Sequence, residues 1–107
     1  MFEEYLSEIG YSNKQISFLR NTYPISSCSE ATLLYNVRNL HHYLTSNNID
    51  NNAFIYITTN VPIIICESIE NIKKRVTDFQ QLGFNKLAFF AILKQFAPSA
   101  QPIKRGE

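Results

Sequence analysis

The sequence predicts an all-α fold, a short right- or left-handed solenoid of helical hairpins with two full repeats and a truncated N-terminal one. The first observation is an internal repeat, in which Pro24, Pro62 and Pro98 are 38 and 36 residues apart, a length typical of helical repeat units. The second is a Gly or Asn that precedes each proline by 14 or 15 residues. The third is an apolar periodicity of three and four residues within each unit. Together they predict one helical-repeat domain over residues 1–98 and an extended tail over residues 99–107.

Each unit contains a junction at which one helix ends and the next begins. The three junctions read Gly10-Tyr11-Ser12, Asn48-Ile49-Asp50 and Gly83-Phe84-Asn85. Their first residue is Gly or Asn, which most readily adopt the positive φ of a helix C-terminus. Their third residue can accept hydrogen bonds from the free N–H groups of a new helix. The apolar residue between them is placed to pack back on the new helix.

The expected helices follow from these junctions in chain order. They cover residues 2–9, 13–22, 30–46, 51–60, 68–82 and 86–96. Each second helix of a unit has apolar residues at the sixth, ninth and thirteenth positions after the junction's first residue, which lie on one face. These residues are Ile16, Leu19 and Tyr23; Phe54, Ile57 and Val61; and Phe89, Ile92 and Phe96. The proline that follows is expected to end each helix, because it has no N–H to donate.

The first helices of the two full units also carry apolar stripes. In the middle unit the stripe is Leu34, Val37, Leu40 and Leu44. In the last unit, Ser68 is the expected N-cap and the stripe is Ile69, Ile72, Val76, Phe79 and Leu82. Because adjacent helices share these faces, nine residues are expected to be mostly buried. They are Phe54, Ile57, Ile72, Val76, Phe79, Leu82, Phe89, Ile92 and Leu93.

A β-hairpin is the local alternative for residues 53–66. The segments 53–59 and 61–66 are rich in β-branched and aromatic residues, and Asn60-Val61-Pro62 could form the turn between two strands. The equivalent windows of the other units have a helical pattern, however, and copies of one unit should share one conformation. The repeat therefore favours a helix here.

The segment from Pro62 to Phe84 resembles the repeat of the mitochondrial transcription termination factor (mTERF) family. The resemblance lies in the proline, the short apolar turn after it, the helix start Ser68-Ile69-Glu70-Asn71 and the junction Leu82-Gly83-Phe84. It covers about residues 6–98 and is closest over 62–98. The resemblance implies units of two long helices and a short 3₁₀ turn, stacked into a curved solenoid whose basic concave surface holds duplex nucleic acid.

Positive charge is concentrated in the last unit. The chain has ten basic and nine acidic residues, and the net charges of residues 1–23, 24–61, 62–98 and 99–107 are −1, −1, +2 and +1. The candidate nucleic-acid-binding residues are Arg38, Lys73, Lys74, Arg75, Lys86 and Lys94. Contacts from such residues to phosphates would give weak, salt-sensitive binding. The alternative for Lys73-Lys74-Arg75 is a solvated helix face next to Glu70.

No other constellation indicates chemistry. His41 and His42 diverge by about 100° on a helix and cannot both ligate one metal unaided. The sequence has no nucleophile elbow, Gly-rich phosphate loop or zinc motif, so no enzymatic activity, metal or cofactor is expected. Cys28 and Cys66 each follow a repeat proline by four residues. Neighbouring helical layers lie roughly 8 to 10 Å apart, too far for a disulfide, so both cysteines are expected to be small buried hydrophobic residues.

The same composition predicts a cytoplasmic protein without a membrane segment. The N-terminal stretch Met1–Tyr5 is acidic, the longest apolar run covers only residues 62–66, and two cysteines are too few to staple a secreted domain. The predicted function is therefore that of a non-enzymatic helical-repeat module with weak, largely sequence-independent nucleic-acid binding. The alternative is a protein-interaction module, because tyrosine is favoured at interfaces. Its groove would include Tyr5, Tyr11, Tyr35, Tyr43 and Tyr56.

Overall fold

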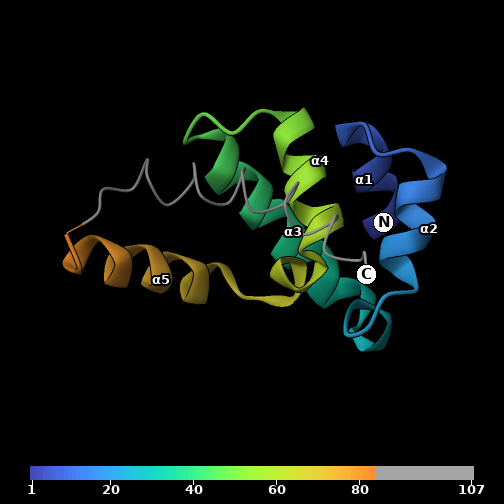
Figure 1. The fold of residues 1–107 in the computed structure, drawn as a ribbon. Coiled ribbons are helices and arrows are strands. Elements are labelled where there is room, and N and C mark those ends of the chain that lie inside the picture. Colours follow the sequence, from blue (N-terminus) through green and yellow to red (C-terminus); the bar gives the residue numbers. More distant parts are fainter. Residues whose placement is uncertain (84–107) are drawn as a thin grey trace, which may run out of the picture.

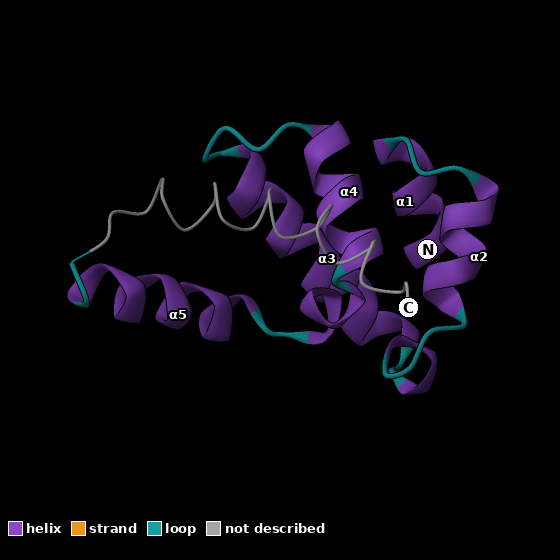
Figure 2. Cartoon of the chain, in the orientation of Figure 1, coloured by secondary structure: helices purple, strands orange, loops and turns teal. Residues whose placement is uncertain are grey.

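The chain folds into helices joined by short turns (Figures 1 and 2). The structure, a computed structural model, describes residues 1–83. Its elements are α1 (Phe2–Ile9), α2 (Asn13–Arg20), the 3₁₀ turn η1 (Ile25–Ser27), α3 (Glu30–Thr45), α4 (Asn51–Asn60), the 3₁₀ turn η2 (Pro62–Cys66) and α5 (Ile69–Gln81). Every regular element of these residues is helical, which confirms the all-α prediction. The predicted helix 86–96 and the tail 99–107 lie outside the described residues.

The five other predicted helices are present and differ from the structure only at their ends. The helix expected over 13–22 ends at Arg20, the one over 30–46 ends at Thr45, and the one over 68–82 covers Ile69–Gln81. The β-hairpin alternative is wrong, because residues 53–59 lie in α4 and residues 62–66 form η2. Among residues 1–83, no helix combines the length and apolar character needed to cross a membrane.

Backbone conformation and capping at the junctions follow the predicted register. Gly10, Asn48 and Gly83 have φ angles of +126°, +72° and +103°, the half of φ space that side chains with a Cβ rarely adopt. The predicted N-cap side chains accept backbone hydrogen bonds: Ser12 from Gln15, Asp50 from Ala53 and Ser68 from Asn71. Tyr11 and Ile49 are buried next to these caps. The third junction's Phe84 and Asn85 lie outside the described residues.

Three predictions about apolar faces are wrong. Tyr23 is 80% exposed, because α2 ends three residues earlier and no longer holds it in helical register. Leu82 is 75% exposed, because it lies just past the last residue of α5. In α3 the fully buried position is Leu33, while Leu34 is only half-buried, so the stripe begins one residue earlier than predicted.

Helix α3 is the central element of the described part of the chain. It contacts α1, α4, η2 and α5, while η1 contacts η2. Helices α1 and α2 form one antiparallel pair beside it, and α5 extends away on the other side (Figure 1). Along the chain, the order helix, helix, 3₁₀ turn occurs for residues 2–27 and again for residues 30–66.

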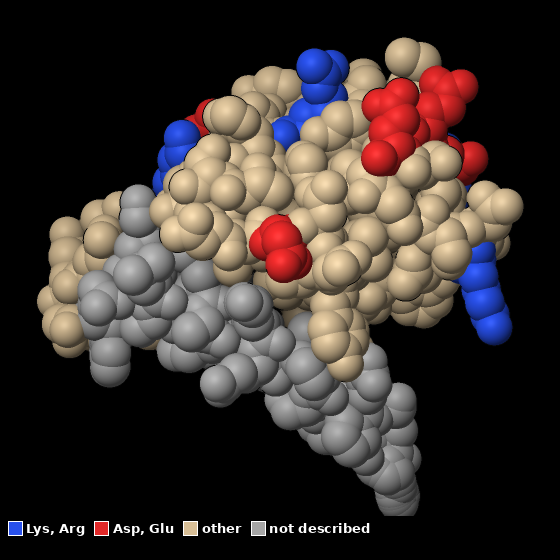
Figure 3. Space-filling model, turned by 90° about the horizontal axis from the view of Figure 1, so that it is seen from above, with Lys and Arg blue, Asp and Glu red and all other residues tan. Residues whose placement is uncertain are grey.

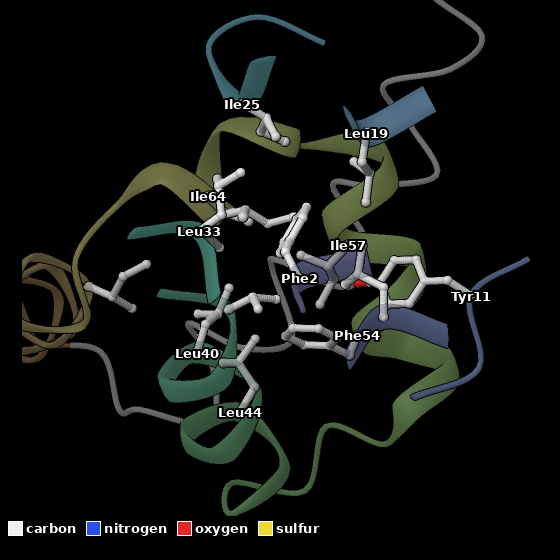
Figure 4. Packing of buried hydrophobic residues seen from close by; sticks show 14 of the residues in the cluster. Phe2, Tyr11, Leu19, Ile25, Leu33, Leu40, Leu44, Phe54, Ile57 and Ile64 are labelled. Carbon is white, nitrogen blue, oxygen red and sulfur yellow. The ribbon is translucent and has the colours of Figure 1, made fainter. Parts of the chain in front are cut away.

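The core lies where these elements converge (Figure 4). Its fully buried side chains come from α1 to α4 and both 3₁₀ turns: Phe2, Leu6, Leu19, Ile25, Leu33, Val37, Leu40, Leu44, Phe54, Ile57 and Ile65. From the predicted core, Phe54, Ile57, Ile72 and Val76 are buried and Phe79 is half-buried. The remaining predicted core residues Phe89, Ile92 and Leu93 lie outside the described residues.

A buried polar contact joins the first junction to α4. The hydroxyl groups of Tyr11 and Thr58 are 2.5 Å apart, and Thr58 Oγ1 also donates to the Phe54 carbonyl at 3.0 Å. Burial raises the pKa of Tyr11 above its ordinary value of 10.0, although the hydrogen bond with Thr58 opposes the shift. The neutral phenol is therefore strongly favoured in the folded protein.

We expect Phe54→Ala to lower the free energy of unfolding by about 3 to 5 kcal/mol, because the side chain is fully buried. Tyr56→Ala on the exposed face of the same helix is the matched control and should cost less than about 1 kcal/mol. Urea denaturation followed by circular dichroism measures both. Equal losses would contradict the assigned face of α4.

We expect stability to fall above pH 10 in a way that depends on Tyr11. The pKa of this phenol is raised on folding, so above pH 10 the unfolded state loses a proton that the folded state keeps. The free energy of unfolding then falls by about 1.4 kcal/mol per pH unit for this group. Denaturation curves at increasing alkaline pH should show a shallower fall in Tyr11→Phe. Tyr5 and Tyr43, whose pKa values are also raised by burial, remain in both proteins. Identical slopes would be inconsistent with this assignment.

Candidate nucleic-acid interface

The three consecutive basic residues of the last unit lie on the solvent side of α5. The Ser68 cap starts the helix, and burial of Ile69, Ile72 and Val76 fixes which face points to the core. Lys73, Lys74 and Arg75 are all exposed. The amphipathic pattern of α5 therefore places these cations in contact with solvent.

Each of the three cations has a partner within the chain. Lys74 Nζ lies 3.4 Å from Asp78 Oδ2, and Arg75 Nη2 lies 3.2 Å from Glu67 Oε2. Lys73 Nζ lies 5.5 Å from the centre of the Tyr43 ring on α3, within range of a cation–π interaction. Successive helical residues diverge by about 100°, so the three side chains reach partners in three directions.

The acidic partners of the basic run come from both sides of it. The sequence places Glu70 next to the run, and in the structure Lys74 pairs with Asp78 and Arg75 with Glu67. The four-residue spacing of Lys74 and Asp78 is the standard spacing for a helical ion pair, so this partner could have been found. Arg75 and Glu67 are eight residues apart across the start of α5, a separation that carries no such signal.

The other candidate residues do not extend this group within residues 1–83. Arg38 is exposed on α3, about 140° around the helix axis from Tyr43. It is close enough to Tyr5 of α1 to lower the pKa of that phenol, although burial is the larger effect and the net shift is upward. Lys86 and Lys94 lie outside the described residues.

The surface charge is dispersed on the face shown in Figure 3. There the Lys and Arg side chains are separated by uncharged residues, and acidic side chains gather at the end where α1 and α2 lie. A single dense basic patch is therefore not a feature of this face. Within residues 1–83, Lys73, Lys74 and Arg75 on α5 are the one run of three consecutive basic residues.

The five tyrosines of the alternative do not form one groove. Tyr11 is buried in the core with only 5% of its surface exposed, because it follows Gly10 at a tight junction and packs on α4. Tyr5 is half-buried, and its hydroxyl lies 3.1 Å from His41 Nδ1. Tyr35 and Tyr56 are exposed, but they belong to different helices.

Of the two histidines, His41 has a structural role. His41 Nε2 lies 2.7 Å from Asn51 Oδ1 and its Nδ1 lies next to the Tyr5 hydroxyl, so both ring nitrogens have hydrogen-bond partners. His42 is exposed on the neighbouring position of α3. Residues 1–83 contain no group of three or more His, Cys, Asp or Glu side chains placed to hold a metal ion.

The predicted separation of the two cysteines is wrong. Cys28 Sγ and Cys66 Sγ are 3.9 Å apart, and both residues are only partly buried. The prediction used the spacing of packed helices, but both cysteines lie at the ends of η1 and η2, which contact each other directly. Short 3₁₀ turns approach more closely than helices with full side-chain layers between them.

Comparisons of this chain with models of known protein families, with curated proteins and with solved structures found no significant match. No family membership follows from similarity. The resemblance to the mTERF repeat therefore stays a hypothesis based on the quoted motifs.

The ion pairs on α5 are of the kind that an incoming phosphate can displace. Lys74 and Asp78 are 74% and 58% exposed, so water screens this pair on both sides. In the second pair Arg75 is 65% exposed and Glu67 is 26% exposed, so water screens it mainly from the Arg75 side. Exposed pairs of this type contribute about 0 to 1 kcal/mol. The cations can therefore exchange their carboxylate partners for phosphate groups at little cost.

We expect Lys74→Ala and Arg75→Ala each to change the free energy of unfolding by less than about 1 kcal/mol. Their ion pairs are exposed and their side chains are not part of the core. Chemical denaturation measures this, and a larger loss would mean that the pairs stabilise the fold. The outcome also decides whether these variants can be used in binding experiments without concern for unfolding.

Proposed function

We propose that this protein is a non-enzymatic helical-repeat module, a short solenoid similar to mTERF repeats, that binds nucleic acid weakly and with little sequence preference through its last unit. The binding surface is centred on Lys73, Lys74 and Arg75 of α5. We place its work in the cytoplasm, because two cysteines are too few to staple a secreted domain.

The order of the elements supports the solenoid part of the proposal. The sequence of two helices and a 3₁₀ turn occurs for α1, α2 and η1 and again for α3, α4 and η2, and α5 then starts a third round. This is the unit that the mTERF resemblance implies. Contact between η1 and η2, at equivalent places in successive units, is what stacking of such units requires.

The exposed cations of α5 are the observation that carries the binding part. Three positive side chains lie in sequence on one exposed helix segment, and their intramolecular partners are weakly held. Phosphate contacts of this kind orient a nucleic acid without reading its sequence.

A protein-interaction role is the second candidate, and one observation favours it. Tyr35 is 57% exposed and lines a surface hollow of α3 together with Leu34 and Arg38. Tyrosine and arginine are enriched at protein interfaces. This surface lies apart from the cations of α5, so the two roles predict different sensitive residues.

We expect labelled duplex and single-stranded oligonucleotides to bind the full chain at low salt, with affinity that falls as salt rises. Replacing Lys73, Lys74 and Arg75 together by Ala should abolish binding. Each single replacement that removes one duplex phosphate contact should instead reduce the slope of log affinity against log salt by about 0.9. Fluorescence anisotropy measures both quantities.

The matched control for this experiment compares Lys74→Ala with Lys14→Ala, which removes one exposed lysine from α2. Lys14→Ala should leave binding close to that of the unaltered chain, whereas Lys74→Ala should weaken it. Absence of binding at low salt, or binding indifferent to salt and to the α5 substitutions, would reject the nucleic-acid proposal. The role at Tyr35 would then be the one to pursue, starting from Tyr35→Ala.

A further inference from the structure

The two cysteines of the chain meet although 38 residues separate them. Cys28 directly follows η1, and Cys66 is the last residue of η2. Each stands four residues after the proline of its unit, so equivalent positions of successive units face each other. Their sulfur atoms, 3.9 Å apart, are already in van der Waals contact.

The surroundings allow these sulfur atoms to approach further. A disulfide requires about 2.05 Å between them, so they must move together by roughly 2 Å. Cys28 has extended backbone at the end of a turn, where a side chain can change rotamer without disturbing a helix. Both side chains are partly exposed, which gives a small oxidant access to them.

We propose that Cys28 and Cys66 form a redox modification site, which a small-molecule disulfide such as oxidised glutathione converts into an intramolecular disulfide between the turns η1 and η2. In the first step the Cys28 thiol loses its proton and attacks one sulfur of oxidised glutathione, which breaks the glutathione S–S bond and forms a mixed disulfide. The displaced glutathione thiolate takes up that proton and leaves as reduced glutathione. In the second step Cys66 attacks the Cys28 sulfur of that mixed disulfide. The Cys66 proton leaves with the second reduced glutathione, so two protein thiols are oxidised and one glutathione disulfide is reduced.

The order of these steps follows from the environment of Cys66. Burial, with the nearby Cys28 sulfur as a smaller cause, raises the pKa of the Cys66 thiol to about 11. Because the thiolate is the attacking species, Cys66 is a poor first nucleophile at neutral pH. Once glutathione is attached to Cys28, the target bond is held beside Cys66, and proximity compensates for its low thiolate fraction.

The bond would close a loop that contains α3 and α4 and would tie one unit to the next. It would remove conformations from the unfolded chain, the main way in which a disulfide stabilises a fold. The proposal uses only residues 28 and 66 and their turns, and it stands or falls independently of nucleic-acid binding.

The test incubates the reduced full chain in glutathione buffers of increasing oxidation and measures the intact mass and the free thiols. The expected product is a monomer that has lost two hydrogen atoms and both free thiols. Treatment with dithiothreitol should restore both. The midpoint of thermal unfolding of the oxidised product should rise by roughly 10 °C. Cys28→Ser and Cys66→Ser are the matched controls, and neither should show this mass change or this rise.

A second measurement tests whether the disulfide forms because the fold brings the two thiols together, or merely because the chain contains two thiols. The effective concentration of one cysteine for the other, obtained against glutathione, should be about tenfold or more higher in the folded chain than in urea. Equal effective concentrations in the two states would overturn the proposal. So would a folded chain that yields only glutathione adducts or disulfide-linked dimers.

Discussion

Burial of the Phe54 ring is the interaction on which the arrangement of the first four helices depends. The ring meets Tyr11 edge-on with centroids 6.5 Å apart and His41 with centroids 4.9 Å apart. One side chain of α4 thereby contacts both the junction of α1 with α2 and the C-terminal part of α3. Hydrogen bonds that join His41 to Tyr5 on one side and to Asn51 on the other hold the same group together. With α4 fixed in this way, η2 starts beside η1, and the start of α5 follows.

Most of the helices could be predicted because local chemistry determines where each helix starts and where the chain turns. Capping by Ser12 and Asp50 and positive φ at Asn48 depend on a few neighbouring residues, and such signals can be read from one sequence. The repeat also resolved the ambiguous β-branched segment of α4, which a purely local interpretation would have assigned to strands. Errors arose at helix ends, where Tyr23 and Leu82 lose the register that their spacing implies.

The candidate site was less predictable because its contacts cross between elements. The sequence identified the exposed run on α5, but its contacts with Tyr43 and Glu67 depend on how α3 and the turn after η2 are placed. Dispersal of charge over the surface likewise depends on tertiary structure. The meeting of Cys28 and Cys66 shows the same limit, since a generic distance between helical layers does not apply where two turns touch.

The positive φ angles at the three junctions have a consequence for how such a sequence changes over evolutionary time. Helix faces can exchange Leu, Ile, Val and Phe with small losses, so their identity drifts quickly. A residue other than Gly or Asn at positions 10, 48 or 83 would strain the backbone, because its φ angle is positive there. The backbone at these three positions therefore restricts the choice of residue more strictly than packing restricts the helix faces, whatever else in the chain is exchanged.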